Sequence, residues 1–283
     1  MPLSSLPIIM LQPLVTAALL EDLGRAGDIT SSAIIPADAI TTTVLSSRQA
    51  GVVAGLDIAT LVFHSINPSI EITTVHANGA RVSPGDALAR VHGPARDILT
   101  AERTALNFLC HLSGIASATA TLVEAVKGYR ANIACTRKTT PGLRAVEKHA
   151  VRLGGGVNHR FGLDDAVLIK DNHVAIAGGI RPAIERARAG VGHLVKIEVE
   201  VDTLSQLEEA LAAGVDAVLL DNMSIAELSR AVAMVGGRAI TEASGRVTVD
   251  TAPAIAETGV DLISSGWLTH SAPILDIGLD YQA

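Results

Sequence analysis

The stretch LVKIEVEVDTLSQLEEALAAGVDAVLLDNMSIAELSRAVAMVGGRAITEASG, residues 194–245, decides the fold. It repeats one unit, in which a short apolar run is followed by a turn, an amphipathic segment with helical spacing and a closing glycine. Strands that alternate with short helices predict parallel strands joined by right-handed crossovers. The runs recur at intervals of roughly 20 residues, a rhythm that is typical of a β/α barrel.

The same pattern extends to both sides of this stretch. Between the later strands we predict helices over 203–214, 224–237 and 250–259. The predicted strands are 131–136, 166–170, 194–201, 217–221, 239–243 and 261–265.

The first part of the chain, up to about residue 100, has a different rhythm. Helical spacing predicts a helix over 13–23. Short β-rich runs between Ile40 and Val91 are separated by turn residues, which indicates a small α+β unit. Residues 100–128 predict one long helix or a pair of helices.

The composition excludes several classes of protein. With 48% hydrophobic and 18% charged residues, the 283-residue chain supports a sizeable core and is not disordered. Its 22 Lys and Arg against 29 Asp and Glu disfavour nucleic acid or an anionic membrane as the main partner. An anionic small molecule remains compatible with this balance if basic residues gather in a cleft.

The cysteines and the N-terminus indicate the compartment. Cys110 and Cys135 both lie in apolar stretches and are interpreted as small hydrophobic residues in a reducing environment. The N-terminus MPLSSLPIIMLQPLV lacks a basic region and is interrupted by prolines, so it does not resemble a signal peptide. No uninterrupted apolar run is long enough to span a bilayer. We therefore expect a soluble cytoplasmic protein.

Polar residues follow every predicted strand of the barrel. Because the C-terminal ends of barrel strands form the rim that carries the active site, six such ends in succession predict a functional rim. These residues are Thr136, Arg137 and Lys138 after the first strand, Lys170, Glu200 and Asp221 at the next three ends, and Ser244-Gly245 and Ser265-Gly266 after the last two.

The basic residues near these ends suit anions. Arginine binds carboxylates and phosphates through two parallel hydrogen bonds, and lysine acts as a point charge. The ordinary alternative is a solvated patch, which we assign to Arg144, Lys148 and Arg152 because they recur every four residues along one helix face. His159 alone fits a loop histidine, but its neighbours favour a ligand role. The candidate anion-binding residues are Arg137, Lys138, His159, Arg160 and Lys170.

Acidic residues at the strand ends suggest a site for a metal ion or a sugar. Glu198 and Glu200 alternate along one strand and therefore point to the same side, as does Lys196. This row is either a structural ion pair or part of a site in which Glu200 and Asp221 hold Mg²⁺ or a sugar hydroxyl.

Glycine-rich loops complete the pattern. The triple glycine at 154–156 permits positive φ and close approach of the backbone, or it caps a helix. The loops Ser244–Arg246 and Ser265–Trp267 occupy positions that bind phosphate in barrels. The residues alone thus predict a β/α barrel enzyme that binds a phosphorylated sugar and a carboxylate with Mg²⁺, without revealing the reaction.

Taken together, these motifs resemble those of one known enzyme family. The chain resembles the quinolinate phosphoribosyltransferase family, also called carboxylating nicotinate-nucleotide pyrophosphorylase. The resemblance implies an N-terminal α/β sandwich domain over residues 1–110, followed by an incomplete, about seven-stranded β/α barrel over 111–283 whose C-terminal tail returns to the first domain. The motifs that carry it are EDLGRAGDIT, AERTALNFLCHLSG, TRKTTPGLRAVEKHAV, GGGVNHRFGL, LIKDNH, EVEVDTL, LLDNM and EASG.

The resemblance also implies a reaction. Quinolinate and 5-phosphoribosyl-1-pyrophosphate would give nicotinate mononucleotide, pyrophosphate and CO₂ in NAD biosynthesis, with Mg²⁺. The implied roles follow the motifs. Arg137, His159 and Arg160 bind the quinolinate carboxylates, with Thr136 beside them. Lys138 and Lys170 contact the pyrophosphate or the reacting centre. Glu200 and Asp221 bind ribose hydroxyls and Mg²⁺, directly or through water. Ser244, Gly245, Arg246, Ser265, Gly266 and Trp267 hold the 5′-phosphate. Lys138, Lys170, Glu200 and Asp221 are the catalytic candidates.

The resemblance further implies a homodimer with shared active sites, alone or within a higher oligomer, because Arg103 matches an arginine that reaches the neighbouring subunit. The chain departs from the family pattern at Cys135, where aspartate is common, and at Arg246, where a second glycine is common. Two alternatives stay open, namely a phosphoribosyltransferase that acts on nicotinate without decarboxylation, and a silent barrel that binds phosphorylated metabolites.

Overall fold

The computed structural model describes residues 3–282, which separate into two compact units. The first unit contains residues up to 120, residues 140–155 and the C-terminal residues from 269. The second contains residues 121–139 and 156–268. The domain boundary predicted at residues 110 and 111 falls within helix α4 (Ala95–Ala125). The first unit's opening segment ends later, at Ala120, which also lies within this helix.

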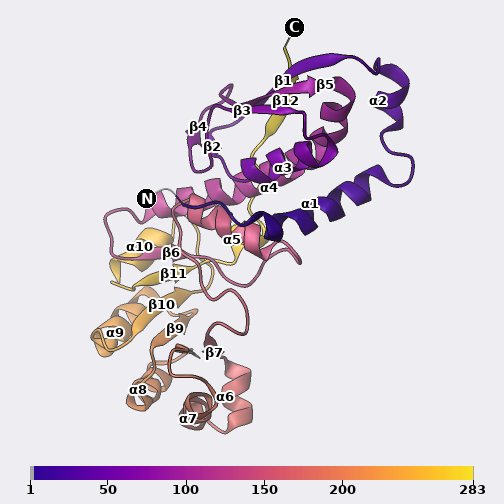
Figure 1. Ribbon diagram of the computed structural model, residues 1–283. Helices are drawn as coiled ribbons and strands as arrows, with labels where there is room; N and C mark the ends of the chain where they lie inside the picture. Colours follow the sequence, from indigo (N-terminus) through magenta and orange to yellow (C-terminus); the bar gives the residue numbers. More distant parts are fainter. Residues whose placement is uncertain (1–2, 283) are drawn as a thin grey trace. The chain divides into compact units, whose positions relative to one another are not determined.

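A four-stranded antiparallel sheet organises the first unit (Figure 1). Its order is β12-β1-β5-β3, formed by Ile277–Tyr281, Ile40–Ser47, Ala87–Pro94 and Glu71–Thr74. The register runs from Thr43 opposite Tyr281 to Ser47 opposite Ile277, so the C-terminal tail belongs to this unit. Strands β2 (Gly51–Val52) and β4 (Arg81–Val82) form a separate antiparallel pair.

The helices of the first unit differ in part from the prediction. Helix α1 (Ile8–Leu23) begins earlier than the predicted 13–23 and includes Pro13. Helix α2 covers Ile29–Ile34. Helix α3 (Leu56–Ile66) was not predicted, because its β-branched and aromatic residues are common in strands, although its buried residues recur with helical spacing. Helix α4 starts before the predicted residue 100.

Helix α4 is long and apolar enough to cross a membrane by length and composition. In the protein, however, 61% of its most apolar stretch is buried. A helix that is apolar around most of its circumference and covered in this way is typical of a core helix.

Helix α5 (Arg144–Leu153) corrects one prediction. Arg152 is exposed, but the side chain of Lys148 is buried, with a relative exposure of 1%. Glu147 beside it is completely buried. The predicted solvated face of Arg144, Lys148 and Arg152 is therefore wrong for Lys148, because the helix is covered on more sides than its apolar stripe indicates.

The second unit contains a six-stranded parallel sheet with the order β6-β11-β10-β9-β8-β7. All six predicted strands are confirmed: β6 Asn132–Ala134, β7 Val167–Ile169, β8 Ile197–Val201, β9 Ala217–Asp221, β10 Ile240–Ser244 and β11 Leu262–Ser264. Strands β6 and β7 are its edges, so the barrel is incomplete. Val157 adds a single parallel bridge to Ala134 of the edge strand β6, beside the six strands of the sheet.

The helices of this unit follow the predicted alternation and flank the sheet (Figure 1). Helix α8 begins with a capping box of Thr203 and Gln206, and α9 with one of Ser224 and Glu227. Each ends at a glycine in the left-handed region, which stops the helix and turns the chain into the next strand. These helices are α6 Asp171–Ala177, α7 Ile180–Gly190, α8 Leu204–Ala213, α9 Ile225–Val235, α10 Ala252–Glu257 and α11 Trp267–His270.

Candidate active site

A pocket of about 390 Å³ lies in the second unit, where the parallel strands end. It collects most of the residues that the sequence placed on the functional rim. Its lining is formed by Thr136, Arg137, Lys138, His159, Arg160, Leu168, Lys170, Glu200, Leu219, Asp221, Glu242, Ser244 and Ser264.

The register of the sheet explains why the polar ends meet. Ser244 of β10 lies beside Asp221 of β9 on one side and beside Ser264 of β11 on the other. Side chains of a strand alternate between its faces, so Glu242 and Ser244 share one face of β10. Neighbouring parallel strands thus bring the three side chains to one edge of the sheet.

Arg137 and Arg160 form the strongest cationic feature of the pocket. The Nε atoms of both guanidinium groups are buried and have no hydrogen-bond partner among residues 3–282. Burial, and next the positive charge of Arg137, lower the pKa of Arg160 from its usual value. One Arg160 Nη1 donates to the main-chain oxygen of Ala166 at 2.9 Å. A bound anion would satisfy the buried donors and relieve the repulsion.

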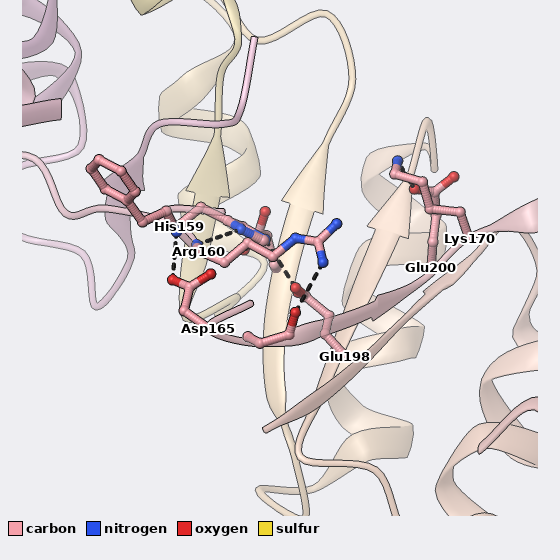
Figure 2. A network of polar contacts seen from close by, with 9 residues as sticks. His159, Arg160, Asp165, Lys170, Glu198 and Glu200 are labelled. Carbon is pink, nitrogen blue, oxygen red and sulfur yellow. Dashed lines mark hydrogen bonds and ion pairs between the residues drawn. The ribbon is translucent and has the colours of Figure 1, made fainter. Parts of the chain in front are cut away.

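Lys170 and Glu200 lie at the ends of adjacent strands, apart from Arg160 (Figure 2). Lys170 Nζ donates to Glu200 Oε2 at 2.7 Å. On the next strand, Asp221 Oδ2 accepts a hydrogen bond from Asn222 Nδ2 at 2.6 Å. The pocket therefore has carboxylates on β8 and β9 beside a lysine.

Two residues of the pocket lining, His159 and Glu242, form a largely buried trio with Glu198. His159 Nε2 is 2.9 Å from Glu198 Oε2 and 3.8 Å from Glu242 Oε2. The potential ligand atoms of these three residues lie within 4.8 Å of one another. Because the imidazole is already hydrogen-bonded to Glu198, we interpret the trio as a hydrogen-bonded network of the pocket wall.

The predicted Mg²⁺ residues, Glu200 and Asp221, are not part of this trio. Mg²⁺ usually takes one or two carboxylates and completes its shell with substrate phosphates and water. Two carboxylates on neighbouring strand ends within one pocket fit that donor set.

Cys135 joins the segment that carries Arg137 to the segment that carries Arg160 through two hydrogen bonds. The main-chain N–H of Cys135 donates to the oxygen of Val157 at 3.2 Å, and the Cys135 thiol donates to Asn158 Oδ1 at 3.3 Å. Neither cysteine forms a disulfide and both are buried, which confirms their interpretation as small core residues. At Cys135, which departs from the family pattern, a thiol thus makes the link between segments.

Several predicted site residues lie outside the pocket lining. Arg103 belongs to helix α4 in the first unit. Arg246 adopts a left-handed backbone with φ of 48°, where glycine carries no steric cost. Ser265 is buried, and its main-chain N–H donates to the oxygen of Ala134 at 3.0 Å. The remaining residues outside the lining are Gly245, Gly266 and Trp267.

Some lining residues were not predicted. Glu242 and Ser264 could have been found, because strand alternation places Glu242 on the face of Ser244, and Ser264 ends its strand. Leu168 and Leu219 carry no chemical signal in the sequence. Lys196 was expected beside Glu198, but β8 begins only at Ile197, and Lys196 is exposed and paired with Asp216 at 2.6 Å.

The triple glycine combines both of its expected uses, because Gly154 is the residue that ends helix α5 and the segment also needs the small size and freedom of glycine. Gly155 has φ of 89°, in the left-handed region. Gly154 does not, but a Cβ atom there would lie 2.3 Å from the main-chain oxygen of Ala116. Gly154 is therefore required by close packing against α4, within the first unit.

Two family models cover nearly the whole chain. Residues 28–113 match the N-terminal domain of quinolinate phosphoribosyl transferase, and residues 115–280 match its C-terminal domain. The chain belongs to the quinolinate phosphoribosyltransferase family. The resemblance inferred from the motifs is thereby confirmed.

Individual members of the quinolinate phosphoribosyltransferase family are similar over almost their full length. The carboxylating nicotinate-nucleotide pyrophosphorylase of Mycobacterium leprae (strain TN) is 46% identical over 94% of this chain and 95% of its own. The decarboxylating quinolinate phosphoribosyltransferase 1b of Nicotiana tabacum is 39% identical over 96% of this chain and 83% of its own. The crystal structure of NadC from Streptococcus pyogenes, 42% identical, superposes with a TM-score of 0.94 and covers 99% of this chain and 100% of that one.

Proposed function

We propose that this protein transfers the phosphoribosyl group of 5-phosphoribosyl-1-pyrophosphate to quinolinate and releases pyrophosphate and CO₂, which yields nicotinate mononucleotide for NAD biosynthesis. The observation that carries the proposal is a pair of arginines, Arg137 and Arg160, whose Nε atoms are buried without a hydrogen-bond partner among residues 3–282, in a pocket that also contains lysines and carboxylates. The names of its relatives point to the same reaction.

Quinolinate is a dicarboxylate and suits the arginine pair. Arg137 and Arg160 are close enough for the charge of one to lower the pKa of the other. A dianion placed between them replaces this repulsion by attraction to both arginines, and its oxygens accept hydrogen bonds from the buried N–H groups. A nicotinate ring has only one carboxylate and would use these donors less completely.

The other charged residues suit the phosphorylated sugar. In the proposal, Lys138 and Lys170 neutralise the pyrophosphate or stand at the reacting carbon, and Glu200 and Asp221 accept hydrogen bonds from ribose hydroxyls. The same two carboxylates would hold Mg²⁺, which supplies further neutralisation of the pyrophosphate when bound. Ser244, which lines the pocket, and the loops Gly245–Arg246 and Ser265–Trp267 remain the predicted 5′-phosphate site.

The chemistry follows from this placement. The bond between the ribosyl carbon and pyrophosphate breaks, its electron pair leaves with pyrophosphate, and the carbon acquires oxocarbenium character. Lys138 and Lys170 stabilise the departing charge by electrostatics that are organised before the reaction. The pyridine nitrogen then bonds to the ribosyl carbon and becomes positive. That charge stabilises the carbanion left at the neighbouring carbon when CO₂ departs, and the carbanion takes up a proton.

The first unit enters the proposal through Arg103 on α4. We propose a homodimer, alone or within a higher oligomer, in which Arg103 of one subunit serves the active site of the other, and we place the enzyme in the cytoplasm. Mixing an Arg103→Ala protein with a Lys138→Ala protein tests this assembly. Partial recovery of activity supports shared sites, and no recovery despite demonstrated subunit exchange contradicts them.

The reaction itself is tested with purified protein, 5-phosphoribosyl-1-pyrophosphate and Mg²⁺, with quinolinate and nicotinate as parallel substrates. Equal release of CO₂ and nicotinate mononucleotide from quinolinate is expected. Turnover of nicotinate without CO₂ would favour the non-decarboxylating alternative. Binding of both substrates without turnover would favour the silent barrel.

A further inference from the structure

Both ring nitrogens of His159 are hydrogen-bonded within the chain (Figure 2). Nδ1 lies 2.7 Å from the main-chain nitrogen of Arg160. Nε2 lies 2.9 Å from Glu198 Oε2. The side chains of His159 and Glu198 are only 12% and 13% exposed, so water competes weakly for these bonds.

These two contacts define the protonation of the ring. A main-chain N–H is always a donor, so Nδ1 must accept and carries no proton. Glu198 as a carboxylate is an acceptor, so Nε2 must donate. The geometry thus selects the neutral imidazole with its proton on Nε2, the tautomer being set by the partner of each nitrogen.

The arrangement fixes the peptide that carries Arg160. Its N–H is bound to the ring of His159, and its guanidinium donates to the oxygen of Ala166. Asp165 closes the following turn, since its carboxylate accepts from the main-chain N–H of Phe161 and of Gly162. The hydrogen bond between His159 and Glu198 connects this loop to the sheet, because Glu198 belongs to strand β8.

We propose that Glu198 is a positioning residue, which holds His159 in the Nε2–H tautomer so that the ring orients Arg160 toward the carboxylate of the substrate. The proposal deepens the proposed function and rests on it for the identity of that carboxylate, which is quinolinate. His159 can bond quinolinate directly only by giving up one of its two present partners. Its principal contribution is therefore made through Arg160.

The tautomer is tested by long-range proton–nitrogen correlation spectra of the full-length, nitrogen-15-labelled protein near neutral pH. The signals of His159 among the nine histidines are assigned by their loss in His159→Gln. We expect a protonated Nε2 and a bare Nδ1, both retained when quinolinate is added. A ring protonated on Nδ1, with or without quinolinate, would overturn the proposal.

The positioning role is tested by steady-state kinetics. Glu198→Ala removes the acceptor from Nε2, and we expect a roughly tenfold to hundredfold increase in KM for quinolinate, with little change in kcat. Glu198→Gln keeps an acceptor oxygen and should restore most of the affinity. In an Arg160→Lys background, the same Glu198→Ala change should alter KM by less than about threefold, because residues that act through one another are not additive.

The controls distinguish failure of this positioning role from failure of the proposed phosphoribosyl transfer. Glu208→Ala, on the exposed side of α8, should leave KM unchanged. If Glu198→Ala does not fold, His159→Phe replaces it, since that ring bonds neither partner, and the same rise in KM is expected. An equal effect of Glu198→Ala in both backgrounds would overturn the positioning role. Absence of turnover in the wild type would instead overturn the proposed function and the substrate part of this proposal.

Discussion

Lys170 Nζ donates to Glu200 Oε2 across 2.7 Å, and the pair joins the ends of strands β7 and β8 at the pocket. The chain contains a second pair of the same kind, in which Lys196 Nζ lies 2.6 Å from Asp216 Oδ1, outside the pocket lining. Two lysine–carboxylate pairs with similar geometry thus differ in location, and each serves as the control for the other.

We predict that Lys170→Met lowers kcat/KM by roughly a hundredfold, because the proposed reaction loses a preorganised positive charge that stabilises the leaving pyrophosphate. Lys196→Met should change kcat/KM by less than about twofold, since an exposed ion pair contributes little. Steady-state assays of both variants measure the difference. Similar losses in the two variants would show that Lys170 acts only as a structural ion pair.

Glu147 is a completely buried carboxylate whose two oxygens are both used. Oε1 accepts from His111 Nε2 at 2.8 Å, and Oε2 accepts from the main-chain N–H of Thr140 at 3.1 Å. We predict that Glu147→Ala lowers the free energy of unfolding by about 3 kcal/mol, because two partly buried hydrogen bonds are lost and a cavity remains at the buried carboxylate. Urea denaturation followed by circular dichroism measures this change.

Two variants control the Glu147 prediction. Glu147→Gln keeps one acceptor oxygen and the volume of the side chain, so it should cost less than Glu147→Ala. Glu185→Ala, at an exposed position of α7, should change the free energy of unfolding by less than about 0.5 kcal/mol. If Glu147→Ala were as stable as Glu185→Ala, the buried network would contribute nothing to stability.

Gly154 is held against α4, where an added Cβ would lie 2.3 Å from the oxygen of Ala116 and 2.7 Å from Thr119 Cβ. Backbone cannot move aside as a flexible side chain does. We therefore predict that Gly154→Ala destabilises the protein by at least about 2 kcal/mol. Gly190→Ala is the matched control, because Gly190 ends α7 and has open space around its Cβ position. The melting temperature should fall in the first variant and stay constant or rise in the second.

His149 gives a prediction with a defined sign. Burial lowers its pKa below the usual 6.5, and the charge of Asp57 opposes this only in part. Between the two pKa values the unfolded chain binds more protons than the folded one, so acidification favours unfolding. The contribution of neutral His149 is complete above about pH 6.5 and is lost as the pH falls toward the pKa of the folded state.

We predict that the free energy of unfolding of the wild type decreases more steeply below pH 6.5 than that of His149→Gln, which has no such titration. Urea denaturation at a series of pH values gives the free energy of unfolding of each protein as a function of pH. Subtracting one curve from the other cancels the contribution of the other histidines, which both proteins share. Parallel curves would show that His149 has the same pKa in both states.

The periodic pattern of the second half was sufficient to predict its architecture. Alternating apolar runs and glycine-terminated helices predicted six parallel strands, and all six are present. The polar strand ends predicted the pocket, because a parallel sheet brings its C-terminal ends to one edge whatever the details of packing. These properties are local and repeat along the chain, so they can be read from it directly.

Helix α3 and the burial of Lys148 could not be predicted in this way. In α3 the residue types favour a strand whereas the apolar spacing favours a helix, so the local signals disagree and packing decides between them. Lys148 lies on the polar side of α5 in the sequence pattern, yet it is buried in the structure. Both outcomes depend on neighbours that are distant in the sequence.

The sequence by itself determined the strand–helix alternation, the rim of charged residues and the family. Only the tertiary structure decided which charges meet: Lys170 with Glu200, Lys196 with Asp216, and His159 with Glu198. The physical reason is that periodicity specifies which face a side chain occupies. A hydrogen bond instead requires two atoms within about 3 Å, and that depends on the register between strands and the path of the loops.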